Sequence, residues 1–502
     1  MLPSPRLHRW LVIVCAGLGM FLVALDIAVN VALPTITSHF HTDIQTIQWI
    51  IVSFVATRAG LAVAAGSLGD LFGLKRVFLI GVLAYTIAVT LIAFSPSLAS
   101  VFGLRVLQGV GAGSLYAAAP AIASRALPAS QRGTAMGVTT AGYALGTIAG
   151  TLGTGLLVGV FGWEAAFLGR VPFCVIAIIL GWLVLREPVL SRSPEQSERA
   201  AEGECVVSRE RRSFDLAGSS SFMAGMVALV LALHMSGRIG WSSPLVIGLL
   251  AATPFLLALF VRSELRARWP VLDLHLLRLP DFMAACSSMF FVHLGAFVIW
   301  FIFPFYVAEA LGRGPIALGA MMALMATAMS LASPGAGWLS DRIHPKYVGL
   351  LGTAIVGLGL AWMSMLDGFS PVLDVGLRIA VVGFGLGSFQ TAAYTLLLKA
   401  LPASQLGTGA GSLSLTQAMG SVVSVSLLGL VFALRTEHHT TALSTEVFST
   451  GETGSEALVL AFQDIFRLGA VLASVGMVVL MLSSLSSGRR KLEKEGIIHP
   501  KE

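Results

Sequence analysis

Long apolar stretches make up most of this chain, and they limit its fold more than any other feature. Fourteen runs of roughly 20 mostly apolar residues follow one another, bounded by charged residues or turn signals. At 1.5 Å per residue, a helix of about that length crosses the roughly 30 Å hydrocarbon core of a bilayer. Only 12% of the residues are charged, against about 25% in soluble globular proteins. The sequence therefore predicts an all-α membrane protein.

The runs form three groups along the chain. Six lie at 10–34, 49–70, 76–95, 100–122, 133–159 and 164–185. Two more lie at 215–236 and 243–262, and the last six lie at 282–307, 315–338, 346–366, 374–398, 406–434 and 464–486. The segment 435–463, rich in Ser, Thr and Glu, is expected to be a solvated surface loop.

This grouping predicts six parts. They are an N-terminal six-helix bundle at 1–185, a cytoplasmic linker at 186–214, two extra transmembrane helices at 215–262, a second cytoplasmic linker at 263–281, a C-terminal six-helix bundle at 282–486 and a cytoplasmic tail at 487–502.

The basic residues indicate orientation, because cytoplasmic loops carry an excess of Lys and Arg. With the N-terminus inside, the outer loops contain only Arg238, Arg313 and Arg435, and the inner segments contain most of the 32 basic residues. Both termini are therefore predicted to be cytoplasmic in a multi-pass protein of the cell inner (plasma) membrane. The net charge of +6 is scattered between apolar runs rather than gathered in one basic domain, so nucleic acid is not an expected partner.

A stretch of twelve residues occurs twice in the chain with few changes. ALPASQRGTAMG at 126–137 returns as ALPASQLGTGAG at 400–411, and GVGAGS at 109–114 matches GFGLGS at 383–388 at the same spacing. The chain is therefore a six-span unit written twice, with two extra spans between the copies. Parallel repeats of this kind place a solute site between the halves, and rocking of the halves exposes it to each side in turn. The repeat favours a transporter over a bundle that merely packs.

Each copy of the repeated dozen opens a span on the predicted cytoplasmic side. A helix N-terminus carries about half a positive charge and attracts an acid, and Asp70 and Asp341 are the acids available on that side. We expect the aspartate of each half to dock on the repeated helix start of the other half and hold the inner face closed.

These residues resemble the major facilitator superfamily, and the fourteen spans resemble its drug:H+ antiporter family. LRVLQGVGAG at 104–113 is similar to that family's fourth-span motif, whose arginine, here Arg105, is implicated in proton coupling, and LDIAVNVALP at 25–34 is similar to its first-span motif, with Asp26 and Asn30. The superfamily's gating motif between spans 2 and 3 is matched by Gly66, Asp70, Gly73, Lys75 and Arg76. The resemblance implies the major facilitator fold, with two six-helix bundles related by pseudo-two-fold symmetry and two extra central helices.

The fifth-span motif of that family is matched by Gly142, Gly146 and Gly150. Small residues at this spacing let a second helix approach closely, so we expect helix packing at the seam where the two halves move. After Trp163 the family commonly has an arginine and later an asparagine, and this chain has Glu164 and Arg170 at those places.

Three charged residues inside the spans are the candidates for proton coupling. An ionisable group within a span costs about 2.5 to 3.5 kcal/mol on insertion scales, so it usually marks a cavity, a partner or a pathway. Counting along each helix places Asp26, Arg105 and Arg58 at depths on the order of 8 to 14 Å, within one layer. We expect Asp26 to pair with one or both arginines and to give the site a proton-dependent charge. The alternative is a permanent ion pair that fixes the three spans.

The substrate cavity is expected to be lined by polar, aromatic and flexible side chains. The candidates are Asn30, His293, Trp300, Phe303, Tyr306 and Met325. Methionine adapts its shape and aromatic rings stack, so such a site suits amphiphilic or lipophilic small molecules, including apolar cations. The alternatives are that these side chains face lipid or, for His293, that a neighbour satisfies its ring nitrogens.

No phosphate-binding loop, metal-ligand spacing or catalytic triad is visible in the sequence. We therefore expect no enzyme activity, no cofactor and no metal. The predicted function is a monomeric secondary active multidrug efflux transporter, which exports its substrate in exchange for protons across the lipid bilayer. The alternatives are a dedicated exporter of one metabolite or lipid, and a membrane sensor or scaffold that does not transport.

Overall fold

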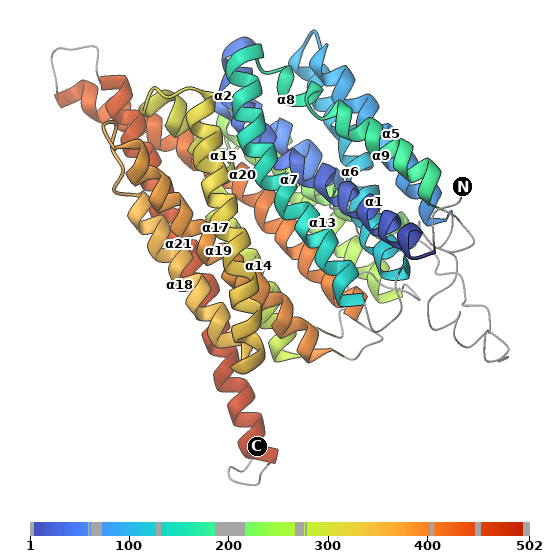
Figure 1. Ribbon diagram of the computed structural model, residues 1–502. Coiled ribbons are helices and arrows are strands. Elements are labelled where there is room, and N and C mark those ends of the chain that lie inside the picture. Colours follow the sequence, from blue (N-terminus) through green and yellow to red (C-terminus); the bar gives the residue numbers. More distant parts are fainter. Residues whose placement is uncertain are drawn as a thin grey trace.

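The computed structural model describes residues 5–58, 61, 73–126, 132–185, 216–266, 276, 279–401, 406–446 and 453–494, and every regular element within these ranges is helical. Figure 1 shows two groups of long helices standing side by side, one from the first part of the chain (blue to teal) and one from the last part (yellow to red). The predicted all-α membrane fold with two helical bundles is confirmed.

The first half contains the elements up to Val184. They are α1 (Pro5–Leu25), η1 (Asp26–Ala28), α2 (Val29–His39), α3 (Ile44–Ile47), a helix over 49–58, α5 (Leu74–Ala93), α6 (Leu98–Ala126), α7 (Arg132–Phe161), α8 (Ala165–Leu168) and α9 (Val171–Val184). We call the side that carries residues 126 and 132 the termini side, and the side that carries residues 39 to 44 the far side.

The rest of the chain forms two central helices and the second half. Between the halves lie α12 (Leu216–Ile239) and α13 (Pro244–Arg266). The second half contains α14 (Pro280–Ala296), α15 (Val298–Phe301), α16 (Phe303–Phe305), the π turn η4 (Tyr306–Ala310), α17 (Pro315–Arg342), α18 (Pro345–Met363), α19 (Val372–Ala400), α20 (Leu406–Glu446) and α21 (Thr453–Lys494).

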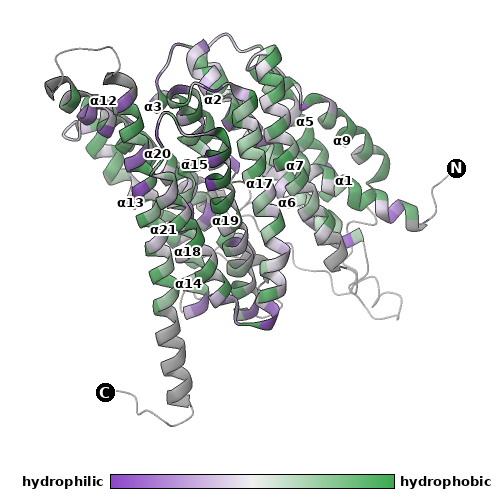
Figure 2. Ribbon diagram, turned by 60° about the vertical axis from the view of Figure 1, so that its left-hand side comes forward, coloured by the Kyte–Doolittle hydropathy of each residue, from purple (hydrophilic) through white to green (hydrophobic). Residues whose placement is uncertain are grey.

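Twelve helices in the described residues are long and apolar enough to cross a membrane. In Figure 2 hydrophobic residues, drawn green, cover most of the length of these helices. Of the two other predicted spans, 215–236 falls within α12, whose apolar part Ser220–Ser236 is shorter. The span at 49–70 is helical over 49–58, and the residues after 61 up to 72 lie outside the described ranges.

Some predicted boundaries differ from the helices. Helix α13 continues to Arg266 and α21 to Lys494, beyond the expected span ends at 262 and 486. The surface loop predicted at 435–463 is wrong at both ends, because α20 continues to Glu446 and α21 begins at Thr453. Threonines in the first of these parts donate their hydroxyls to carbonyls one turn back, as Thr436 does to Phe432, and polar composition therefore did not prevent a helix here.

The first span of each half is broken near its middle. In the first half the 3-10 turn η1 separates α1 from α2, and Pro34 in α2 has no N–H for the carbonyl of Asn30. In the second half α14, α15, α16 and η4 follow one another within the single apolar stretch Pro280–Ala310. Such departures from regular helix are frequent at functional sites.

The repeated glycines pack equivalent helices in the two halves. A Cβ at Gly109 would lie 2.9 Å from the carbonyl oxygen of Phe54, and one at Gly383 would collide with the carbonyl of Met325. Helix α6 therefore lies close against the 49–58 helix, and α19 lies equally close against α17. The motif GVGAGS is a packing motif of a membrane helix.

The stripe Gly142, Gly146 and Gly150 packs within the first half. A Cβ at Gly146 would lie 2.5 Å from the carbonyl oxygen of Phe21, and one at Gly142 would collide with the carbonyl of Gly17. The prediction that this stripe lies at the moving seam is therefore wrong, because its partner is α1 of its own half. The seam between the halves is formed mainly by α7 against α17, with α2 against α16 and α17.

Candidate functional site

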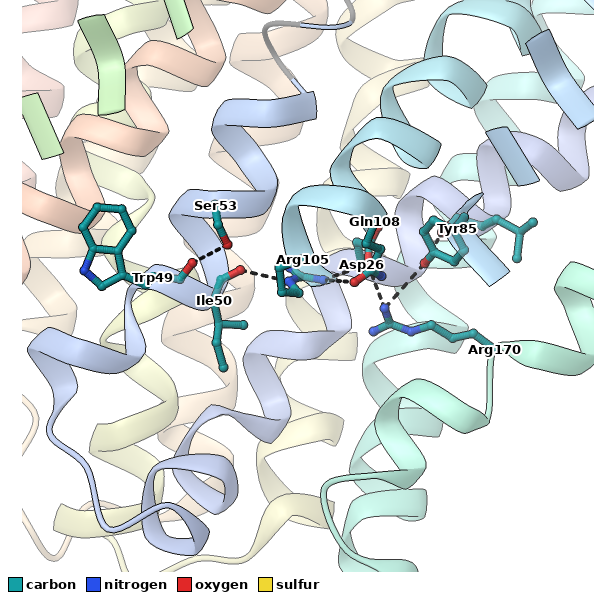
Figure 3. A network of polar contacts seen from close by, with 9 residues as sticks. Asp26, Trp49, Ile50, Ser53, Tyr85, Arg105, Gln108 and Arg170 are labelled. Carbon is teal, nitrogen blue, oxygen red and sulfur yellow. Dashed lines mark hydrogen bonds and ion pairs between the residues drawn. The ribbon is translucent and has the colours of Figure 1, made fainter. Parts of the chain in front are cut away.

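A cluster of buried charged and polar side chains lies where η1, α6 and the start of α9 meet. Figure 3 shows the carboxylate of Asp26 surrounded by Arg105, Gln108 and Arg170. The side chains of Asp26, Arg105 and Arg170 are 1%, 2% and 3% exposed, so water does not solvate these charges. Each charge therefore depends on the others for compensation.

One oxygen of the carboxylate accepts every polar contact that Asp26 makes with these neighbours. Its Oδ1 lies 2.7 Å from an Nη1 of Arg170, 3.3 Å from Nη1 of Arg105 and 2.6 Å from Nε2 of Gln108. Its Oδ2 is buried and has no hydrogen-bond partner among the described residues. A proton on Oδ2 would leave the three contacts to Oδ1 geometrically possible.

The surrounding residues hold the two guanidinium groups in place. Arg105 donates its Nε to the carbonyl of Ile50 at 2.9 Å and its Nη1 to Gln108 Oε1 at 2.7 Å. Its guanidinium carbon stands 4.3 Å from the ring centroid of Phe54. Arg170 lies 3.5 Å from the hydroxyl of Tyr85, and this hydroxyl donates to the carbonyl of Leu22 at 3.2 Å.

Arg170 takes the place that sequence reasoning gave to Arg58. It lies in the break between α8 and α9, at a position where the resembled family commonly has an asparagine. The only sequence signal for it was an arginine inside a predicted span. The cluster therefore carries two cations and one acid, and its net charge is +1 with Asp26 ionised and +2 with Asp26 protonated.

Arg58 does not pair with Asp26, so of the two arginines expected as its partners the structure brings Arg105 to it. Among the described residues it has no carboxylate within 4.0 Å, and its guanidinium lies 5.6 Å from the Phe54 ring and 5.8 Å from the Tyr116 ring. Arg105 on α6 donates to the carbonyl of Ile50, which lies on the same helix as Arg58. Arg58 follows Ile50 by about 12 Å along that helix at 1.5 Å per residue. Arg58 therefore lies about two turns closer to the termini side.

Both ring nitrogens of His293 have protein hydrogen-bond partners, as the alternative to a substrate-binding role predicted. Its Nδ1 lies 3.0 Å from the carbonyl oxygen of Met289, and its Nε2 lies 2.9 Å from Nε2 of Gln390. The carbonyl can only accept, so Nδ1 carries the proton and Nε2 accepts from the amide of Gln390. This pattern fits a neutral imidazole.

The other predicted substrate residues are packed in the core of the structure. Tyr306 donates its hydroxyl to the carbonyl of Asp367 at 2.6 Å, and its ring lies against those of Phe303 and Phe462. Met325 packs on the backbone of Gly383, and Asn30 and Trp300 are 6% and 8% exposed. Trp300, Phe303, Tyr306 and Met325 therefore present no open surface to a substrate in this conformation, because helix packing uses their apolar area.

The predicted gating residues are only partly described. Gly66 and Asp70 lie outside the described residues, as do the proposed helix starts at 127–131 and 402–405. Gly73 has a φ of 87°, which favours glycine, and directly precedes α5. Lys75 donates its Nζ to the carbonyl of Trp182 at 3.0 Å, and the side chain of Arg76 is exposed.

Asp341 lies on the surface of its own half. Its side chain is 77% exposed and forms a 3.9 Å ion pair with Lys399. Both residues line a small cleft on the termini side together with Asp281, Arg342 and His344. The described contacts of Asp341 place it beside α19. The expected docking of each aspartate on the helix start of the other half stays a prediction, because those helix starts lie outside the described residues.

Known proteins resemble this chain over most of its length. The family model described as Major Facilitator Superfamily matches residues 10–425. The multidrug resistance protein Stp of Mycobacterium tuberculosis is 30% identical over 425 residues, which are 84% of this chain and 76% of that protein. The riboflavin transporter RibZ of Clostridioides difficile is 26% identical over 85% of this chain and 89% of that protein.

Two further comparisons extend this picture. The tetracenomycin C resistance and export protein of Streptomyces glaucescens is 26% identical over 86% of this chain and 77% of that protein. Among solved structures, the inward-facing, unoccupied form of a bacterial homologue of the human lysosomal transporter Spinster matches with a TM-score of 0.68 and 14% identity, over 96% of this chain and 98% of that chain. This last likeness concerns the fold alone.

Proposed function

Because this chain belongs to the major facilitator superfamily, we propose that it is a secondary active multidrug efflux transporter of the superfamily's fourteen-span drug:H+ antiporter family. It exports lipophilic or amphiphilic small molecules in exchange for protons by alternating access. The names of its relatives from Mycobacterium tuberculosis and Streptomyces glaucescens support export of drugs. The buried carboxylate of Asp26 supports coupling to protons, because donors surround its Oδ1 while its Oδ2 has no hydrogen-bond partner among the described residues.

The proton acts on the packing of three elements. With Asp26 ionised, its Oδ1 attracts Arg105 on α6 and Arg170 at the start of α9, so that both lie against η1. A proton on Oδ2 neutralises the acid and leaves two arginines without a counter-charge in a buried place, which is costly. Protonation therefore favours a rearrangement that separates the arginines or brings water to them.

This rearrangement shifts the equilibrium between the two conformations of the transporter. The turn η1 interrupts the first span between α1, which packs on α7, and α2, which packs on α7 and also on α16 and α17 of the other half. A shift of α2 relative to α1 thus changes the contact between the halves on the far side. Proton binding at Asp26 couples in this way to opening and closing of the seam.

The protein acts as a monomer in the cell inner (plasma) membrane, with its termini side in the cytoplasm. The excess of Lys and Arg in the segments on the termini side supports this orientation. Transport, and not catalysis, is the proposed activity.

A second candidate is a dedicated exporter of a single metabolite. The riboflavin transporter of Clostridioides difficile, which this chain matches over 85% of its length, supports this alternative. A panel of dyes and metabolites distinguishes the two, because a broad response favours drug export and a response to one compound favours the dedicated exporter. A non-transporting sensor or scaffold would respond to none of them.

The decisive experiment is transport driven by a pH gradient in proteoliposomes that contain the full chain. Asp26→Asn removes the titrating group while keeping the size of the side chain, and it should abolish accumulation driven by the gradient. Substrate exchange without a gradient should continue. The matched control is Asp374→Asn, because Asp374 pairs with Arg378 at 2.6 Å along its own helix and is partly exposed. Gradient-driven accumulation by Asp26→Asn at the wild-type rate would reject the proposal.

A further inference from the structure

Arg58 has no acidic partner among the described residues, unlike four other arginines that lie inside predicted spans. Arg105 and Arg170 contact Asp26, Arg378 lies 2.6 Å from Asp374, and Arg467 lies 3.2 Å from Asp464. An arginine in a span is costly, so it generally faces a partner or a water-filled cavity. The side chain of Arg58 is only half-buried, which fits a place open to water between the helices.

Aromatic side chains from three helices surround Arg58. Its guanidinium lies 5.6 Å from the ring centroid of Phe54 on its own helix and 5.8 Å from that of Tyr116 on α6. Tyr143 on α7 is close enough for its hydroxyl to interact with Arg58. Both tyrosines are half-buried.

The second half contributes to the same place. Tyr394 on α19 is close enough to Tyr116 and Tyr143 to interact with both. Its hydroxyl lies 3.0 Å from the hydroxyl of Ser414 on α20, and its ring is half-buried. We call Arg58, Tyr116, Tyr143 and Tyr394 the Arg58 cluster. It lies between the two halves, which is where alternating access exposes a substrate to each side.

The fold does not need an arginine at position 58. Gly113 packs on the carbonyl of Arg58, and its repeat counterpart Gly387 packs on the carbonyl of Met329. Met329 is therefore the equivalent of Arg58 in the second half. The same helix contact forms around an uncharged side chain, so packing does not explain the charge.

We propose that the Arg58 cluster is the substrate-recognition site and that it selects flat aromatic molecules carrying acceptor oxygens, neutral or anionic, over lipophilic cations. This proposal rests on the transport function proposed above and narrows its substrate class. A guanidinium stacks on planar rings and donates to carbonyl, phenolate or carboxylate oxygens. Tyrosine adds large rings with a polar tip.

The charges near the cluster act in the same direction. Arg58 lies close enough to Asp26 for their charges to interact, although Asp26 already faces Arg105 and Arg170. Among the described residues these three arginines face one acid, Asp26, so a cation entering the site meets a net positive field. The expectation from the Met and aromatic content, which included apolar cations among the substrates, did not take this field into account.

The test compares two dyes that share one ring system but differ in charge. Fluorescein is an anion near neutral pH, and the rhodamine ethyl ester is a cation on the same xanthene rings. Their binding to the purified full chain in detergent is measured by fluorescence polarisation. We expect the dissociation constant of fluorescein to be at least tenfold lower than that of the rhodamine ester.

Variants at position 58 then assign the effect. Arg58→Gln should weaken fluorescein binding about 10- to 100-fold, the usual range for losing a charged hydrogen bond. The dissociation constants of the two dyes should then become similar. Arg58→Lys keeps the charge and should retain a preference for the anion. The control Arg342→Gln removes an arginine that stacks on Trp338 on the termini side, and it should leave both constants unchanged.

Several results would overturn the proposal. They are tighter binding of the cation by the wild type, binding of neither dye, and equal fluorescein binding by wild type and Arg58→Gln when both elute as the same species. If Arg58→Gln does not fold, Arg58→Lys decides, because loss of all anion preference in a folded Lys variant contradicts a charge-based site. The assay uses no gradient, so failure of proton-driven transport would refute the coupling without affecting this result.

Discussion

Gly155 of α7 and Gly319 of α17 meet backbone to backbone across the seam between the two halves. A Cβ on Gly155 would lie 2.9 Å from the Cα of Gly319, and a Cβ on Gly319 would lie 2.8 Å from the Cα of Gly155. Nearby, a Cβ on Gly159 would lie 2.8 Å from the side chain of Ile316. These residues lie towards the far-side ends of both helices, so this close approach belongs to the conformation in which the far side is closed.

Gly155→Ala should therefore shift the transporter towards a conformation open on the far side. The added methyl group has no room in the seam, whereas separation of α7 and α17 removes the clash. Spin labels on far-side loops should report a larger share of long distances. The control is Gly153→Ala on the same helix, where a Cβ meets nothing within 4 Å. Equal distance distributions in the two variants would contradict the assignment of the seam.

Gly146→Ala should instead reduce the stability of the first half. Its Cβ would lie 2.5 Å from the carbonyl oxygen of Phe21 and 2.9 Å from Cβ of Ala24, both within the same half. Overpacking of this kind typically costs about 1 to 3 kcal/mol. The melting temperature in detergent should fall, with little change in the far-side distances. Gly137→Ala, at a position with nothing within 4 Å, should not lower it.

Much of the fold followed from the sequence because the bilayer imposes length and composition on each helix. The apolar runs predicted the spans, and the repeat predicted two bundles with equivalent packing. Gly109 and Gly383 show why the repeat was readable, since both sit against a backbone carbonyl of the neighbouring helix and neither tolerates a side chain. Because only glycine fits such a contact, the packing of the helices can be recognised from the sequence.

The site could be predicted only in part, because its contacts depend on how helices turn about their axes. The pair Asp26 and Arg105 was predicted from charge within the spans, and the structure places them 3.3 Å apart. Depth counting placed Arg58 in the same layer, but the structure puts it about two turns closer to the termini side than Ile50, whose carbonyl Arg105 contacts. Arg170 reaches Asp26 from a break in the sixth span, and no periodicity marks that break.

Arg170→Asn tests whether the second arginine serves coupling. The change leaves Asp26 with Arg105, a balanced pair, so the protein should fold and exchange substrate without a gradient. Protonation of Asp26 would then leave one uncompensated cation instead of two, which weakens the bias between conformations. We expect the ratio of gradient-driven accumulation to gradient-free exchange to fall several-fold. The control Arg467→Gln removes a 60% exposed arginine paired with Asp464, and an equal fall there would show that the effect is not specific to the cluster.

The extra helices are held to the first half by a polar contact on the far side. Gln48, which is 1% exposed, donates its Nε2 to Nδ1 of His234 on α12 at 3.2 Å, and the ring of His234 lies edge-on to Trp49. Helix α12 also packs on α20 of the second half. Helix α12 therefore contacts both halves.

Gln48→Ala should loosen this connection. Loss of a buried hydrogen bond costs about 1 kcal/mol, so the melting temperature should fall slightly and spin labels on far-side loops should report more of the separated conformation. The second effect is the informative one, because a purely local contact would change stability without changing the distances. Gln45→Ala, a half-buried glutamine one turn earlier, serves as the control. If Gln48→Ala lowers stability and leaves the distances unchanged, the extra helices accompany the transport cycle without restraining it.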